Sequence, residues 1–113
     1  MTRYLISFPS SAMDLSEDEF VAAGADAHAV LQDARDAGVY LVSGGINESV
    51  PPVRVHQDGR VTRDTYPQTK VLDGGFMILE VESREEALNW AQKVATACRC
   101  AQEVREFMDD PEA

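Results

Sequence analysis

His28 is the side chain of this sequence best suited to proton transfer, because an unperturbed histidine titrates close to neutral pH. It lies in a stretch whose apolar residues recur at helical spacing, and at roughly 100° per residue it falls on the flank of that apolar stripe. A residue on such a boundary can face a cleft, so His28 is a candidate acid or base. The alternative is a partly exposed helix histidine without a catalytic role.

A second candidate set combines a carboxylate, a phenol and an ammonium group within seven positions, at Asp64, Tyr66 and Lys70. Such groups are able to transfer protons and to hold an anion. The alternative is an ordinary polar turn made rigid by Pro67.

Three arginines give one segment a positive character in an otherwise acidic chain: Arg54, Arg60 and Arg63. In a strand, Arg54 and His56 point to the same face, since side chains alternate. A guanidinium binds a carboxylate in a fork, so this segment is a candidate site for a small anionic ligand. The alternative is that these charges protect an edge strand from aggregation.

The common motifs of cofactor and metal sites are missing. The glycine pairs fit neither GxGxxG nor GxxxxGK[ST], and there is no GxSxG or HExxH. Two histidines cannot form a three-histidine zinc site, and Cys98 and Cys100 alone cannot complete a tetrahedral one. We therefore expect no cofactor and no metal, and two reduced structural thiols in a reducing compartment.

The length of 113 residues fits one domain over 1–113, with a disordered acidic tail from about 109. The net charge of -10 would repel a nucleic acid. No segment approaches the roughly 20 apolar residues of a membrane span, and no signal peptide is recognisable, so we expect a cytoplasmic protein without membrane contact.

Hydrophobic periodicity and turn signals predict the order strand, helix, strand, hairpin, strand, helix, strand. Ser16 and Ser83 each begin a Ser-x-x-Glu capping box, whose reciprocal hydrogen bonds start a helix. Asp58-Gly59 lies between two β-prone runs and predicts the hairpin turn. The predicted strands cover 4–8, 39–43, 53–56, 60–64, 76–82 and 103–108, and the predicted helices begin after the two serines and end near Gly38 and Ala97.

Without the hairpin, this order is βαββαβ, the α+β ferredoxin-like arrangement with both helices on one face of an antiparallel sheet. The run Phe76 to Leu79 is apolar on both sides, which predicts a strand buried on both faces. The face without helices therefore needs a cover. We expect a homodimer that closes two sheets face to face, and the competing cover is the chain's own hairpin.

With these elements placed, the chain resembles the YCII-related family of small bacterial proteins, in the branch named for its Asp-Gly-Pro-Phe motif (DGPF domain). The resemblance rests on Leu72-Asp73-Gly74-Gly75-Phe76, on Glu86-Ala87-Leu88-Asn89-Trp90-Ala91, and on Gly44-Gly45 after the second strand. The defining motif is altered: this chain reads Asp64-Thr65-Tyr66-Pro67-Gln68-Thr69-Lys70, with the proline and aromatic residue in reversed order. Functions tied to that loop do not transfer directly.

The resemblance implies a dimeric α+β barrel with a cleft between sheet and loops, and a largely unassigned biochemical role. It also implies that His28 lies near the position where this branch carries a proposed active-site histidine, with a shift of one residue. Some relatives are associated with sigma-factor genes, and distant ones act on chlorinated muconolactone-like intermediates.

Three functions remain open from the sequence. The first is a small dimeric domain that binds an anionic organic molecule. The second is a cofactor-free lyase or isomerase acting on a lactone or carboxylated intermediate, with His28 as acid or base and a hairpin arginine holding the carboxylate. The third is a protein-interaction or transcription-linked accessory module without a ligand, which predicts a cleft filled by side chains.

Overall fold

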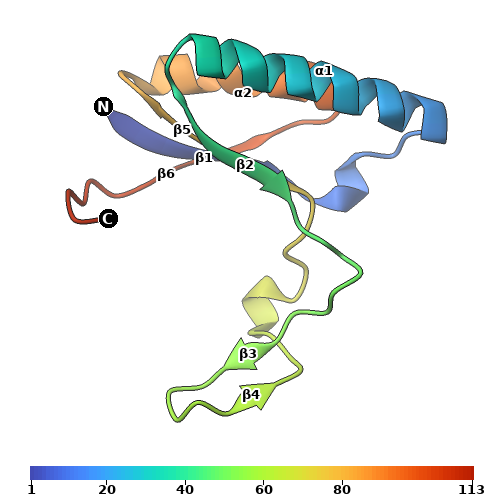
Figure 1. Cartoon of the computed structure of the whole chain (residues 1–113), viewed down its shortest axis with the longest axis vertical. Helices are drawn as coiled ribbons and strands as arrows, with labels where there is room; N and C mark the ends of the chain where they lie inside the picture. The colour runs from blue at the N-terminus through green and yellow to red at the C-terminus, as the bar shows by residue number, and fades with distance from the viewer.

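The computed structural model describes all 113 residues and shows an α+β fold in which two helices lie over one antiparallel sheet (Figure 1). Short 3-10 turns at Ser10–Ala12 and Pro67–Thr69 flank the longer connections. The elements in chain order are β1 (Thr2–Phe8), α1 (Glu17–Asp36), β2 (Tyr40–Gly45), β3 (Arg54–Val55), β4 (Val61–Thr62), β5 (Gly75–Val81), α2 (Arg84–Cys98) and β6 (Glu103–Glu106).

The four-stranded sheet has the order β2-β5-β1-β6, and all neighbouring strands are antiparallel. Each strand–helix–strand unit thus spans a strand from the other unit, which is the split arrangement of the ferredoxin-like fold. The sequence-based prediction of this fold is confirmed.

The hydrophobic core lies between the sheet and the helices. Tyr4 pairs with Leu79 and Ile6 with Met77, so alternate residues of β1 and β5 point to the helix side. Ile6 and Leu79 have almost no exposed surface. On α2, five residues are buried, whereas α1 buries only Ala23 and Ala34. The sheet side of α1 is therefore loosely packed.

Of the two hydrogen bonds predicted for each capping box, only the one accepted by the serine hydroxyl is present at the helix starts. The Ser83 hydroxyl accepts the amide of Glu86 at 3.2 Å, and the Ser16 hydroxyl accepts that of Glu19 at 3.3 Å. The predicted reciprocal bonds from the glutamates are wrong. In a capping box the glutamate carboxylate accepts the backbone amide of the serine, whereas at Ser16 the Glu19 carboxylate accepts the serine hydroxyl at 2.8 Å.

Two predictions about the strands need correction. Met77 and Leu79 are buried, but Phe76 and Ile78 are only partly buried in the single chain, because nothing covers the second face of β5. The last strand ends at Glu106 instead of Met108, although the amide of Phe107 still donates to the carbonyl of Arg3 at 3.0 Å.

Residues 46–74, which we call the arm, leave the body on the side of the sheet away from the helices (Figure 1). In the arm, β3 and β4 form a separate two-stranded sheet, with Arg54 opposite Thr62 and Val55 opposite Val61. The hairpin therefore does not cover the open face of its own sheet, and Val42 on that face stays 53% exposed. The alternative of an internal cover is wrong for the single chain.

Candidate functional site

A cavity of about 780 Å³ lies between α1 and the sheet, where the loose packing of α1 leaves space. This volume falls within the range of small-molecule sites, which is about 300 to 1,000 Å³. Its lining comes from β1, α1, β2, β5 and α2, together with the two ends of the arm. Thirteen of the 25 lining residues are hydrophobic, so most of the wall suits an apolar ligand surface.

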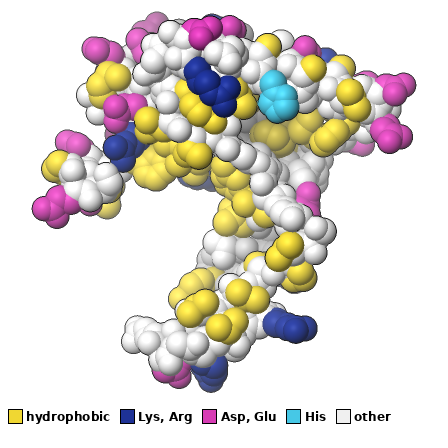
Figure 2. Space-filling model, in the orientation of Figure 1, with side chains coloured by type: hydrophobic (Ala, Val, Ile, Leu, Met, Phe, Trp, Pro, Cys, Tyr) yellow, Lys and Arg dark blue, Asp and Glu magenta, His cyan; other side chains and the backbone are white.

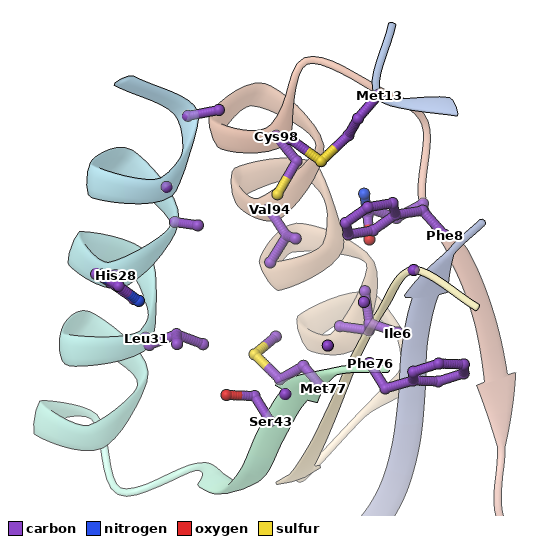
Figure 3. Close-up of a pocket in the computed structure, with 18 of the residues that line it drawn as sticks. Ile6, Phe8, Met13, His28, Leu31, Ser43, Phe76, Met77, Val94 and Cys98 are labelled. Carbon is purple, nitrogen blue, oxygen red and sulfur yellow. The ribbon is translucent and has the colours of Figure 1, made fainter. Parts of the chain in front are cut away.

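The apolar wall is formed by side chains from opposite sides of the cavity (Figure 3). Leu31 projects from α1 toward Met77 on β5, while Val94 and Cys98 come from α2. Ile6 lies at the floor on β1. These residues hold the cavity between rigid elements, which suits a preformed binding site.

His28 lines the cavity from α1 and remains exposed, with no side-chain hydrogen bond to the protein (Figure 3). One helical turn after Leu31, Arg35 also lines the cavity, and its guanidinium carbon lies 4.5 Å from the centre of the Tyr40 ring. Residues seven apart share one face of a helix, so His28 and Arg35 border the same opening. Both offer donors to a ligand.

A polar pair from β2 lies close to these groups. The hydroxyl groups of Tyr40 and Ser43 are 2.8 Å apart, and both residues line the cavity. Since either hydroxyl is able to donate, the pair has one remaining hydrogen for a ligand acceptor. Ser43 follows a register shift in the β2–β5 pairing, which brings it opposite Met77 on the helix side of the sheet.

The other end of the cavity has an acidic cluster, formed where the two ends of the arm meet the Ser10–Ala12 turn. Asp73 accepts the amide and the hydroxyl of Ser10, both at 2.9 Å, and Glu48 lies 3.1 Å from the same hydroxyl. The hydrogen bonds from the Ser10 amide and then its hydroxyl lower the pKa of Asp73 from the usual value. Ser10 and Glu48 line the cavity, so its two ends differ in charge.

The arm carries a second polar cluster around a bidentate ion pair. Arg54 contacts both carboxylate oxygens of Asp64 at 3.1 and 2.6 Å and lies 5.2 Å from the centre of the Tyr66 ring. The Thr62 hydroxyl donates to Asp64 at 2.5 Å and lies 3.0 Å from Nε2 of His56. Because that hydroxyl's hydrogen is used on Asp64, it accepts from His56, which places a proton on Nε2.

Hydrogen bonding from Thr62, and then from Arg54, lowers the pKa of Asp64. All charged groups of this cluster are therefore satisfied within the arm. A shallow depression borders it, lined by Arg54, Val55, His56, Gln57, Asp58 and Tyr66.

The structure thus separates the predicted site residues into two places. His28 lines the cavity, whereas Arg54, Asp64 and Tyr66 lie together on the arm. Lys70 is exposed at the end of the Pro67–Thr69 turn and lines neither place. Within one chain, no hairpin arginine lines the cavity beside His28.

Sequence reasoning missed the polar residues that accompany His28: Arg35, Tyr40, Ser43, Ser10, Glu48 and Asp73. One signal was available for the last of these. Asp73 precedes Gly74-Gly75 directly, and Gly74 has a φ of 87°, so the carboxylate sits at a turn that only glycine forms easily. Ser43 and Tyr40 carried no signal beyond their place in a strand.

Cys98 is buried and Cys100 partly buried, and both are free thiols. Burial raises the pKa of both, and for Cys98 the neighbouring Cys100 adds to the increase. No three His, Cys, Asp or Glu side chains come together in a way that would hold a metal ion. Neither helix has the length and apolar character needed to cross a membrane.

Comparison with known proteins places the chain in a family. The sequence model of the YCII-related domain matches residues 3–109. Among solved structures, the chain is similar to 5-chloro-2-hydroxyhydroquinone dehydrochlorinase from Burkholderia phenoliruptrix AC1100, solved in complex with 2,5-dihydroxybenzoquinone. The TM-score is 0.46 at 17% identity, over 97% of both chains. No curated protein matches the sequence. Since the family match spans nearly its whole length, the chain belongs to the YCII-related domain family.

Proposed function

We propose that this protein binds a small anionic organic molecule in the cavity between α1 and the sheet, and that it does so as a homodimer. The observation that carries this proposal is the open cavity of about 780 Å³, which has apolar walls and a few polar groups at its two ends. A few placed polar groups in an apolar wall are typical of sites that orient a small ligand.

The preference for an anion follows from the charges at the α1 end. Arg35 forms no salt bridge, so its guanidinium stays available to a ligand carboxylate or phenolate. His28 and the hydroxyl pair of Tyr40 and Ser43 supply further donors beside it. Glu48 at the opposite end would repel a second negative charge and would accept from a ligand hydroxyl. A ligand with one acidic end and one hydroxylated end fits best.

The homodimer is proposed because the second face of the sheet is apolar and uncovered. Leu5, Val42 and Ile78 lie on that face, opposite to the helices. The arm of the same chain does not cover it. A second copy offers a matching apolar surface.

We also propose that the protein is cytoplasmic. Its two cysteines are free thiols, as expected in a reducing compartment.

A thermal-shift screen against hydroxylated aromatic acids, aliphatic hydroxy acids and lactones tests the proposal, since a ligand that prefers the native state raises the apparent melting temperature. We expect hydroxy acids to raise the melting temperature of the protein. The Arg35→Gln variant should need at least a roughly tenfold higher ligand concentration for the same shift. His56→Ala changes the other histidine, which lies on the arm, and should leave the shift unchanged. Shifts that are equal in all three proteins would contradict binding in this cavity.

A second candidate, a cofactor-free lyase or isomerase, is favoured by one observation: His28 lines the cavity and has no partner in the protein. An unpaired imidazole at a ligand is able to act as acid or base. Turnover of a lactone or carboxylated substrate should then show a pH limb near neutrality that disappears in His28→Ala and persists in His56→Ala. Binding of such molecules without turnover supports the binding domain. The alternative of an interaction module predicted a filled cleft, and the open cavity does not support it.

A further inference from the structure

The arm has two faces of opposite character. Its polar side chains, Arg54, His56, Thr62 and Asp64, bind one another. The valines between them point to the other face, since side chains alternate along a strand. Val53, Val55 and Val61 on that face are 54, 67 and 57% exposed. Exposure of this valine face to water is unfavourable, because burial of apolar surface stabilises a folded protein.

An isolated two-stranded hairpin is marginal at best in water and gains stability by packing on another element. Here β3 and β4 pair only with each other. Apolar side chains continue along the arm, and Figure 2 shows them gathered on the visible side of it. A monomer rarely exposes so continuous an apolar surface.

The position of the arm indicates what covers this face. The arm descends on the open side of the sheet, so the underside of the sheet and the arm bound a corner (Figure 1). A second copy seated on the open sheet face, as in the proposed homodimer, must lie against the arm. By two-fold symmetry the same contact then forms twice.

Charge also favours a second copy as the partner. The arm has four basic and four acidic residues, which leaves six basic and sixteen acidic residues for the body. Arg60, Arg63 and Lys70 on the arm form no salt bridge. The arm as a whole carries no net charge, but these three cations are able to pair with carboxylates on the acidic body of another copy.

We propose that the valine face of the arm, Val53, Val55 and Val61, packs against the body of a second copy, so that each arm clasps its partner. This inference rests on the proposed homodimer and adds a contact that the sheet faces alone do not require. If the valine face instead binds a different protein, the purified chain should be a monomer in solution.

The experiment compares self-association of the wild type with the double variant Val55→Thr/Val61→Thr, by sedimentation equilibrium. Threonine keeps the shape and strand preference of valine but replaces a methyl group with a hydroxyl. We expect the dimer dissociation constant to rise at least roughly tenfold. Val21→Thr is the matched control, because Val21 on α1 is 69% exposed and lies away from the arm. It should leave the constant unchanged.

A photo-crosslinking amino acid at position 61, in a mixture of isotopically light and heavy chains, provides a second measurement. Crosslinks between a light and a heavy chain support the clasp even if the double variant unfolds its arm. A monomeric wild type overturns both the homodimer and the clasp. A dimeric wild type with an unchanged constant in the double variant, and with crosslinks only within one chain, overturns the clasp but not the sheet-face dimer. Ligand binding in the cavity is measured separately.

Discussion

Asp73 binds Ser10 twice: one carboxylate oxygen accepts the Ser10 amide and the other its hydroxyl, both at 2.9 Å. Ser10 follows β1, whereas Asp73 ends the arm, so this pair fixes the returning end of the arm to the body. Glu48, at the outgoing end, lies 3.1 Å from the same hydroxyl and shares its single hydrogen with Asp73. The two ends of the arm thus meet at one residue beside the cavity.

The first prediction concerns the pH dependence of this contact. The pKa of Asp73 is lower in the folded than in the unfolded chain, where it lies near 3.9, so the carboxylate stabilises the fold above that pH. The stabilisation is lost as the pH falls through the lower, folded pKa. We expect Asp73→Asn to lower the free energy of unfolding at pH 7 and to reduce its decrease in acid. Urea unfolding at several pH values measures both.

Asp33→Asn is the matched control for this prediction, since Asp33 is an exposed α1 residue whose carboxylate has no hydrogen-bond partner. It should leave the free energy of unfolding nearly unchanged at both pH values. Equal effects of the two substitutions would show that the Asp73 contact does not stabilise the fold.

The second prediction concerns the hydrogen-bond chain of the arm. Thr62→Val keeps the shape of the residue but removes the hydroxyl that links Asp64 to His56. The pKa of Asp64 should then rise, because the Thr62 hydrogen bond is the main cause that lowers it. NMR titration of the carboxylate measures this change. Hydrogen exchange at the Gly59 amide, which donates to His56, should also become faster in the variant.

Removal of the arginine provides the comparison for Thr62→Val. Arg54→Gln should also raise the pKa of Asp64, since it removes both the guanidinium hydrogen bonds and the positive charge that lower this pKa. An unchanged pKa of Asp64 in Arg54→Gln would contradict a contribution from the ion pair.

The third prediction concerns the thiols. Burial raises the pKa of Cys98 and Cys100, so the reactive thiolate is scarce at neutral pH. Both should react slowly with a disulfide reagent in the native protein and rapidly after unfolding. Cys98 lines the cavity, whereas Cys100 does not, so a ligand bound there should slow Cys98 in a Cys100→Ser variant. Native rates equal to those of the unfolded chain would contradict the burial of these thiols.

The fold followed from sequence because its signals are local. Each of these signals depends only on residues close together in the chain: the periodicity of α1 and α2, the Ser83 cap and the apolar run of β5. They can therefore be recognised without knowing which distant residues they pack against. The site did not follow, because the cavity exists where α1 stands off from the sheet, and packing of this kind joins residues far apart in sequence. Ser10 and Asp73, 63 positions apart, show the same limit. Asp58-Gly59 predicts the hairpin turn correctly, but no nearby residues indicate that the hairpin stands apart from the four-stranded sheet.

The last prediction compares two glycines that both adopt positive φ. Gly74 has φ 87° and Gly59 has φ 86°, so alanine is strained at either position, by about 1 to 2 kcal/mol. Their surroundings differ. A Cβ at Gly59 meets nothing within 4 Å, whereas a Cβ at Gly74 would lie 2.0 Å from the carbonyl oxygen of Phe8 and 2.8 Å from the amide of Ser10. Those are backbone atoms, which cannot rotate away.

Gly74→Ala should therefore displace the end of the arm from β1 and break the Ser10–Asp73 contact, with a loss of more than roughly 3 kcal/mol in the free energy of unfolding. Gly59→Ala lies at the hairpin tip, so its smaller cost falls on the arm alone and leaves the global unfolding transition nearly unchanged. Chemical denaturation of both variants measures the difference. Equal losses would mean that backbone conformation, and not the close approach to β1, is what requires glycine at position 74.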